Sequence, residues 1–306
     1  MFALREEEMI MKKKALAVTL TAMMAMSMLA GCSDAQNAAE DTAAEAAEDD
    51  AAETTEDAAG ETADAAEDSD VAYIQDKGTL IVGITDFEPM DYKDENGDWI
   101  GFDADMAKKV AEDLGVEVQF VEIDWDNKIL ELNNKSIDVV WNGMTLTDEV
   151  TSSMECTNAY CNNAQVVVLP ADKADEYPDA ESMKGTLAFA VEAGSAGEEA
   201  AKENEFDYTA LTSQADTLME VSAGTSDASI IDLLMAGAMI GEGTDYPNLT
   251  HTIELTTEEY GVGCRKGSDL ASYINDEFKK LYEDGTMQQI AEEYGVQDAL
   301  VDQSQE

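Results

Sequence analysis

The stretch GTLIVGI at residues 78–84 is a short apolar run with a glycine in front of it, a pattern that predicts a buried first strand. Residues 103–114 then carry apolar side chains at helical spacing and stop before Gly115, a residue type that commonly ends a helix. The pattern continues with a strand at 116–121, a short helix at 125–134 and a strand at 137–141. Strand, helix, strand, helix, strand predicts a parallel sheet with crossover helices.

A second series of elements follows residue 164. The patterns predict strands at 165–169, 187–191 and 228–231, with helices at 195–204, 215–223 and 233–240. A returning strand at 259–264 and two amphipathic helices at 270–283 and 287–294 end the chain. From Val71 onward the chain is long enough for one large α/β domain or for two lobes of about 100–150 residues each.

The first 32 residues predict export. Three lysines at 12–14 precede an almost uncharged run at 15–30 that ends in Leu29-Ala30-Gly31-Cys32. This order is typical of a secretory signal, and the run is shorter than the about 20 apolar residues of a membrane-spanning helix. With cysteine after small residues, the segment resembles a bacterial lipoprotein signal peptide at 11–31. The resemblance implies a lipid anchor on Cys32; the alternative is an ordinary signal with an incidental cysteine.

Two further segments lie outside the predicted fold. Residues 1–10 carry three glutamates ahead of the lysines, and we interpret them as a mis-assigned start, with translation from Met11. Residues 32–70 are mostly alanine, threonine and acidic residues, with fifteen Asp or Glu and no Lys or Arg. Such a segment cannot bury enough apolar surface to offset its chain entropy. We therefore predict an acidic, disordered tether between the lipid and the folded body.

The charge of the chain excludes several classes of partner. There are 68 acidic and 17 basic residues, a formal net charge of −51 at pH 7. A field of this sign repels nucleic acid and anionic lipid headgroups, so neither is an expected partner. It also disfavours anionic ligands unless local bases or dipoles override it.

Cysteine and histidine usage predicts no metal and no cofactor. After Cys32 there remain Cys156, Cys161 and Cys264, with no Cys-x-x-Cys pair and with His251 as the one histidine. Cys156 and Cys161 could form a disulfide after export or remain small buried thiols. Both interpretations stay open at the level of sequence.

An ordered set of short motifs runs along the folded part: Phe87-Glu88-Pro89-Met90, Gly101-Phe102-Asp103, Ile137-Asp138-Val139, Asn142-Gly143-Met144-Thr145-Leu146-Thr147, Gly194-Ser195 and 261–268. The set resembles the extracellular solute-binding proteins, family 3, of polar amino-acid ABC transporters. The resemblance implies a two-lobed, periplasmic-binding-protein-like (type II) α/β clamp with two hinge strands. Lobe 1 would comprise 71–164 and 253–306, and lobe 2 would comprise 165–252.

The resemblance also implies a ligand site between the lobes. Asp232 follows the apolar run of a strand, where α/β folds place ligand groups, and its counterpart in the family takes the ligand ammonium. The competing interpretation is an N-cap for the helix at 233–240. Phe87 and Trp125 match the aromatic walls around the ligand, although large aromatics are more often core. Gly143 and Thr145 match positions that offer polar groups to the ligand.

One departure from the family concerns the ligand carboxylate. Ser195, after Gly194, matches the anion-facing turn of lobe 2, but Val150 stands where the family usually has the arginine that clamps the carboxylate. Glu192 and Asp86 instead add acids near the site. Two hypotheses follow. Either the ligand is cationic or an amine without an α-carboxylate, or the carboxylate is held by helix-start N–H groups and a lysine such as Lys128.

The predicted function is that of a lipid-anchored, monomeric substrate-binding component of an ABC importer. It would bind an amino acid or related small amine outside the cytoplasm and deliver it to a permease and its ATPase. The alternatives are a sensor or receptor lipoprotein on the same fold, or a periplasmic dehydratase-like enzyme. An enzyme would need a placed acid, base or nucleophile, and neither the histidine nor the cysteines lie in such a pattern.

Overall fold

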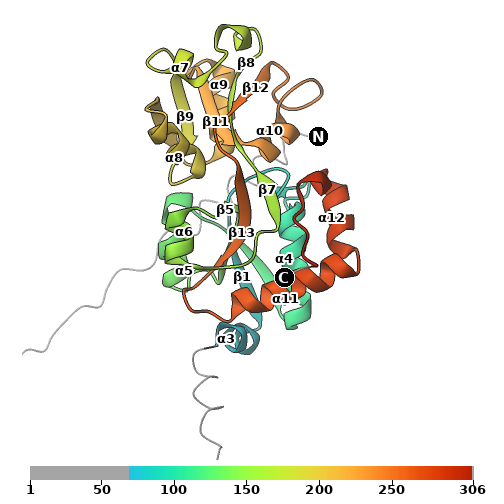
Figure 1. The fold of residues 1–306 in the computed structure, drawn as a ribbon. Helices are drawn as coiled ribbons and strands as arrows, with labels where there is room; N and C mark the ends of the chain where they lie inside the picture. Colours follow the sequence, from blue (N-terminus) through green and yellow to red (C-terminus); the bar gives the residue numbers. More distant parts are fainter. Residues whose placement is uncertain (1–68, 305–306) are drawn as a thin grey trace, which may run out of the picture. The chain divides into compact units, whose positions relative to one another are not determined.

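The computed structural model describes residues 69–304, which form two α/β lobes (Figure 1). The predicted start, signal peptide, lipidation site Cys32 and tether up to residue 68 lie outside the described residues. Within the described part, no helix combines the length and apolar composition needed to cross a membrane.

Lobe 1 is built on a sheet of six strands. Its order is β4 (Glu117–Glu122), β1 (Thr79–Ile84), β5 (Val139–Thr145), β13 (Glu258–Cys264) and β6 (Glu155–Cys156), with β7 (Cys161–Asn163) also paired to β13. The first three strands are parallel, as the alternating pattern predicts, and β13 returns antiparallel to β5. The other lobe 1 elements are α3 (Asp70–Lys77), β2 (Tyr92–Lys93), β3 (Trp99–Ile100), α4 (Phe102–Leu114), η1 (Trp125–Asn127), α5 (Lys128–Asn133), α6 (Asp148–Ser153), α11 (Leu270–Glu283), α12 (Thr286–Tyr294) and η3 (Gln297–Ala299).

Lobe 2 contains a five-stranded sheet. Its order is β10 (Asp207–Leu211), β9 (Ala188–Glu192), β11 (Ala228–Asp232), β8 (Gln165–Pro170) and β12 (Leu249–Glu254). Around it lie η2 (Ala174–Glu176), α7 (Ala180–Met183), α8 (Ala196–Glu203), α9 (Gln214–Ala223) and α10 (Leu233–Met239). The sequence patterns miss β10 and β12. Both are edge strands in which exposed and half-buried side chains outnumber buried ones, so they lack the continuous apolar run of a central strand.

Two chain segments connect the lobes. One runs from β7 directly into β8, and the other returns from β12 into β13 (Figure 1). Each sheet therefore contains strands from both crossings, which is the predicted hinge arrangement. Aromatic pairs support the two cores: Trp141 meets Phe278 edge-on at 5.6 Å in lobe 1, and Phe189 stacks on Phe206 at 4.4 Å in lobe 2.

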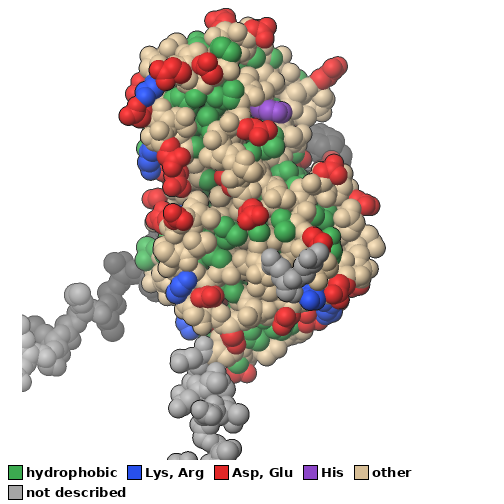
Figure 2. Space-filling model, viewed as in Figure 1, with side chains coloured by type: hydrophobic (Ala, Val, Ile, Leu, Met, Phe, Trp, Pro, Cys, Tyr) green, Lys and Arg blue, Asp and Glu red, His purple; other side chains and the backbone are tan. Residues whose placement is uncertain are grey.

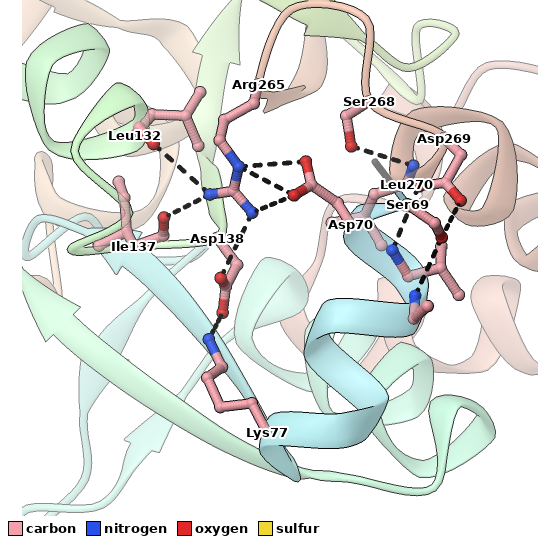
Figure 3. Close-up of polar contacts among 12 residues, drawn as sticks. Ser69, Asp70, Lys77, Leu132, Ile137, Asp138, Arg265, Ser268, Asp269 and Leu270 are labelled. Atoms are coloured by element: carbon pink, nitrogen blue, oxygen red, sulfur yellow. Dashed lines mark hydrogen bonds and ion pairs between the residues drawn. The ribbon is translucent and has the colours of Figure 1, made fainter. Parts of the chain in front are cut away.

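A buried ionic group, which we call the Arg265 cluster, joins Asp70, Lys77, Asp138 and Arg265 (Figure 3). Arg265 Nη2 lies 2.8 Å from Asp70 Oδ1 and 3.6 Å from Asp138 Oδ1, and Lys77 Nζ lies 2.5 Å from Asp138 Oδ2. Arg265 Nη1 also donates to the Ile137 carbonyl at 3.0 Å. Burial alone would raise the pKa of Asp70, but the hydrogen bonds and charge of Arg265 outweigh it and lower that pKa.

The Arg265 cluster corrects one predicted boundary. Asp70, assigned to the tether, is 8% exposed and begins α3, with Ser69 as the N-cap that accepts from the Ala72 N–H at 3.0 Å. Composition could not reveal this, because the partner that holds Asp70 in the fold is 195 positions away. The cysteines are also settled: Cys156, Cys161 and Cys264 are free thiols in the structure.

Candidate functional site

A cavity of about 250 Å³ lies between the lobes, and both contribute side chains to it. Seven of the eight residues predicted for ligand binding line it: Phe87, Trp125, Gly143, Thr145, Glu192, Ser195 and Asp232. Asp86 is the exception, because its side chain is exposed and does not line the cavity. Asp86 lies in the loop after β1, between Thr85 and Phe87, which do line the cavity.

The lobe 1 wall depends on close packing at Gly143. This glycine has φ +52°, and a Cβ built there would lie 2.5 Å from Phe87 Cε1, so a side chain would collide with the predicted aromatic wall. The Gly143 N–H donates to Asp103 Oδ2 at 2.6 Å, and the Tyr160 hydroxyl donates to the same oxygen at 2.7 Å. Asp103 of the Gly-Phe-Asp motif thus holds the strand that forms this wall.

Trp125 and Lys128 form the side of the cavity where lobe 1 meets lobe 2. Lys128 Nζ lies 5.0 Å from the centre of the Trp125 ring and donates to the carbonyls of Trp125, at 3.3 Å, and Gly194, at 2.8 Å. Lys128 is 7% exposed, and burial lowers its pKa. The bond to Gly194 links the lobes directly.

The lobe 2 turn at Gly194 approaches lobe 1 very closely. Gly194 has φ +70°, and a Cβ there would lie 2.7 Å from the Asp126 Cα, so glycine is required both for the turn and for the contact. The next residue, Ser195, is the N-cap of α8. Its hydroxyl donates to the Glu192 carbonyl at 2.7 Å and accepts from the Glu198 N–H at 3.1 Å. The hydroxyl therefore serves the turn as well as lining the cavity.

Asp232 lies at the carboxyl end of β11 with 3% of its surface exposed. Its side chain makes no capping bond to α10, so the competing N-cap interpretation does not describe it. Oδ1 accepts from Asn163 Nδ2 at 2.5 Å, Gln165 Nε2 at 3.1 Å and the Tyr260 hydroxyl at 2.5 Å. Within the described part of the chain, Oδ2 accepts from Gln214 Nε2 alone, at 2.5 Å. Oδ2 thus has room for another donor.

The partners of Asp232 include residues that sequence reasoning missed. Asn163 and Gln165 lie on the outgoing hinge segment, and Glu258 and Tyr260 lie on the returning strand. Glu258 Oε1 accepts from Asn163 at 2.6 Å, from Gln165 at 2.8 Å and from the Thr145 hydroxyl at 3.0 Å. Burial, and then the charge of Glu258, raise the pKa of Asp232 well above its usual value. The one feature of the sequence that could have indicated these partners is that the polar residues Asn163 and Gln165 stand beside an apolar strand.

Glu192 ends β9 beside Asp232 and is 2% exposed. Among residues 69–304, no group donates a hydrogen bond to its buried Oε1. Burial raises the pKa of Glu192 to about 8, and the charge of Asp232 adds to the effect, while Lys128 and Gln214 oppose it. The cavity therefore contains two adjacent buried carboxyl groups, and no Lys or Arg of the described chain forms an ion pair with either.

Val150 occupies the wall where the family resemblance places an arginine. It is 4% exposed, it lines the cavity, and its N–H donates to the Thr147 hydroxyl at 3.2 Å. The basic residues of the lining are Lys128 and Lys202, and Lys202 pairs with Glu198 at 3.0 Å. Arg265 lies in its own cluster and does not line the cavity. The cavity thus combines carboxylates, backbone polar groups and aromatic walls, a set suited to hold a small polar cation.

A family model for the bacterial extracellular solute-binding proteins, family 3, matches residues 80–297. This chain belongs to that family. The L-cystine-binding protein TcyJ of Escherichia coli (strain K12) is 27% identical over 225 residues, covering 72% of this chain and 84% of the relative. The arginine-binding extracellular protein ArtP of Bacillus subtilis (strain 168) is 27% identical, covering 71% and 86%.

A solved structure supports the fold as well. The ABC uptake transporter substrate-binding protein from Streptococcus pneumoniae with bound histidine aligns with a TM-score of 0.69 at 28% identity, covering 77% of this chain and all of that one. The predicted family and the two-lobed type II fold are confirmed. Like the rest of its family, the present chain is a solute-binding protein and not an enzyme. Within residues 69–304, no group of three or more His, Cys, Asp or Glu side chains is arranged to hold a metal ion.

Proposed function

We propose that this protein is the substrate-binding component of an ABC importer and closes its two lobes over an amino acid or related small amine. Asp232 holds the ligand ammonium through Oδ2, and the rings of Phe87 and Trp125 enclose its apolar part. Gly143, Thr145 and Ser195 contribute polar groups from the two facing walls, and Glu192 contributes a second carboxylate.

One observation carries this proposal: residues predicted from both lobes line the same cavity, and the buried Asp232 carboxylate there has an oxygen, Oδ2, with one hydrogen-bond donor from the described chain. An ammonium group supplies both the charge and the donors that such an oxygen lacks. Three relatives, an L-cystine-binding protein, an arginine-binding protein and a substrate-binding protein with bound histidine, support an amino acid or a related amine as the ligand.

The N-terminal segment completes the proposal. Lipidation at Cys32 would anchor the protein at the outer face of the cell membrane, and the acidic segment would act as a spacer. A monomer tethered in this way would present captured ligand to a membrane permease and its ATPase. The acidic face of both lobes (Figure 2) fits a protein that works away from anionic lipid headgroups.

The test is isothermal titration of the protein from residue 69 onward against the twenty amino acids, agmatine, putrescine and cadaverine. We expect at least one tight ligand with 1:1 stoichiometry and a raised melting temperature in its presence, because a ligand that binds only the folded state stabilises it by mass action. If none of these compounds binds the wild-type protein, the proposed function is wrong. A matched control is Asp207→Asn, which changes an exposed acid on β10 outside the cavity.

A further inference from the structure

We propose that Glu192 is the specificity-determining residue of the cavity, selecting ligands of net positive charge and exchanging its own proton for the ligand cation. This inference rests on the proposed function and adds to it the charge class of the ligand. Both claims depend on how Glu192 is buried and on which groups face it.

The Glu192 side chain has a buried oxygen without a hydrogen-bond partner in the described part of the chain. Glu192 Oε1 is buried, lines the cavity with the rest of its side chain, and has no hydrogen-bond donor among residues 69–304. A buried polar atom without a partner costs about 1–3 kcal/mol, and more when it carries charge. Such an atom at the wall of a binding cavity is explained if the ligand provides the donor.

The charged groups around Glu192 are mostly acidic. Asp232 faces Glu192 from β11, Asp216 and Gln214 approach from α9, and Lys128 faces it from α5 across the lobe boundary. Lys128 is the one cation in this set, and its Nζ is already bound to two carbonyl oxygens. A zwitterion with a neutral side chain has one ammonium group, which can pair with Asp232 and leaves no cation for Glu192. A ligand with a second cationic group can pair with both acids.

The Glu192 carboxyl group would lose its proton when a cation binds. Without a cation beside it, buried Glu192 keeps its proton at neutral pH, since burial raises its pKa to about 8. A ligand cation favours the ionised carboxylate. Binding therefore converts Glu192–COOH and ligand cation into a Glu192 carboxylate–ligand ion pair, and the proton passes to solvent. Affinity should rise with pH up to about 8 and level off above it.

The experiment compares ligands that match in shape and differ in charge. L-arginine and L-citrulline share their α-groups and length, but only arginine has a cationic side chain; agmatine is arginine without the carboxylate. Titrations at pH 6, 7, 8 and 9, in two buffers of different ionisation enthalpy, give both the affinity and the number of protons released. Putrescine and cadaverine, with L-ornithine and L-glutamine, extend the comparison to shorter cations and to a neutral side chain.

For the wild type we expect the tightest ligand to be a net cation, at least tenfold tighter than its neutral counterpart, with release of a proton at pH 7. Glu192→Gln should reduce that ratio at least fivefold and lower the proton release. Asp207→Asn, which changes the exposed acid on β10 outside the cavity, should change neither quantity by more than about twofold.

Two results would overturn the inference while leaving the proposed function intact. One is a neutral or anionic amino acid as the tightest ligand. The other is a Glu192→Gln protein that keeps the charge ratio and the proton release of the wild type, which would make Glu192 a neutral structural acid. The melting temperature of each variant, measured without ligand, separates loss of binding from loss of folding.

Discussion

Two groups of buried acids in this protein differ in how their charge is balanced. In the Arg265 cluster, Asp70 and Asp138 are paired with Arg265 and Lys77 within hydrogen-bonding or ion-pair distance (Figure 3). In the cavity between the lobes, Glu192 and Asp232 are as deeply buried, but no basic side chain of the described chain pairs with them. The first group balances its own charge, and we propose that a ligand cation balances the second.

In this strongly acidic protein, the paired acids of the Arg265 cluster stabilise the fold, and we propose that the unpaired acids Glu192 and Asp232 bind the ligand. A buried carboxylate is tolerated when a cation and hydrogen bonds compensate it, and a chain with 17 basic residues can supply few such cations. The only arginine after residue 5 is used to attach α3 to the lobe 1 sheet. Asp91 and Asp103 are also buried without a cation from the described chain, but they receive hydrogen bonds from Asn142, the Gly143 N–H and the Tyr160 hydroxyl. Glu192 and Asp232 differ from them because they line the cavity between the lobes. Four predictions test this contrast.

The largest expected effect is on stability, at the paired cluster. Arg265→Met leaves Asp70 and Asp138 without their shared cation, and removing one partner of a buried ion pair costs about 3–5 kcal/mol. Urea unfolding at pH 7 measures the change, and Arg265→Lys, which keeps the charge but not the fork of donors, should lose less. Ligand affinity of the folded protein should stay within twofold. A variant as stable as the wild type would mean that the cluster contributes no net stability.

The next effect is on binding, at the unpaired acids. Asp232→Asn removes the charge that we propose holds the ligand ammonium, and loss of one partner of a buried charge pair costs about 2–5 kcal/mol, or roughly 30- to 5,000-fold in affinity. The free energy of unfolding should change by no more than about 1 kcal/mol, because an amide still accepts from the hinge donors. Titration calorimetry and urea unfolding together measure the contrast with Arg265→Met. Ligand binding unchanged in Asp232→Asn would remove Asp232 from the site.

The pH dependence of the ligand-free protein gives a third test. Glu192 has a pKa of about 8 in the folded protein against 4.5 as its ordinary value, so between these the folded state binds more protons than the unfolded state. Stability should therefore fall as pH rises from about 5 to 8, and Glu192→Gln should make that fall shallower. The raised pKa of Asp103, about 7, acts in the same direction, so part of the decline should remain. Melting curves from pH 5 to 9 that run parallel for the two proteins would contradict the assignment.

The smallest effect is expected at Lys128. Lys128→Met removes the bond to the Gly194 carbonyl between the lobes, but it also removes a buried charge, so the two changes partly offset each other. We expect a loss of affinity below tenfold, equal for arginine and agmatine, measured by titration. A loss confined to arginine would show instead that Lys128 holds the ligand carboxylate in place of the arginine that Val150 replaces.

Sequence reasoning reached the fold and most of the predicted cavity because those signals are local. Strand and helix periodicity predicts the parallel strands β1, β4 and β5. The apolar run before Asp232 places it at the end of a strand, and the motifs of the family resemblance place Phe87 and Gly143 in the site. Edge strands β10 and β12 were missed because their exposed side chains carry no apolar run. The prediction that Asp86 lies in the site was wrong, because the sequence does not show the path of its loop. In the structure Asp86 is exposed.

By itself, the sequence determined that this is a two-lobed solute-binding protein with an acidic body and with Val150 at the position of the family arginine. Only the tertiary structure decided which acids are paired. Arg265 reaches Asp70 across 195 positions, and Asn163 reaches Asp232 across 69. Ion pairs form through space over a few ångströms, so their partners cannot be read from neighbouring residues. The same folding that pairs Asp70 leaves Glu192 and Asp232 together in a cavity, where a ligand can bring the missing charge.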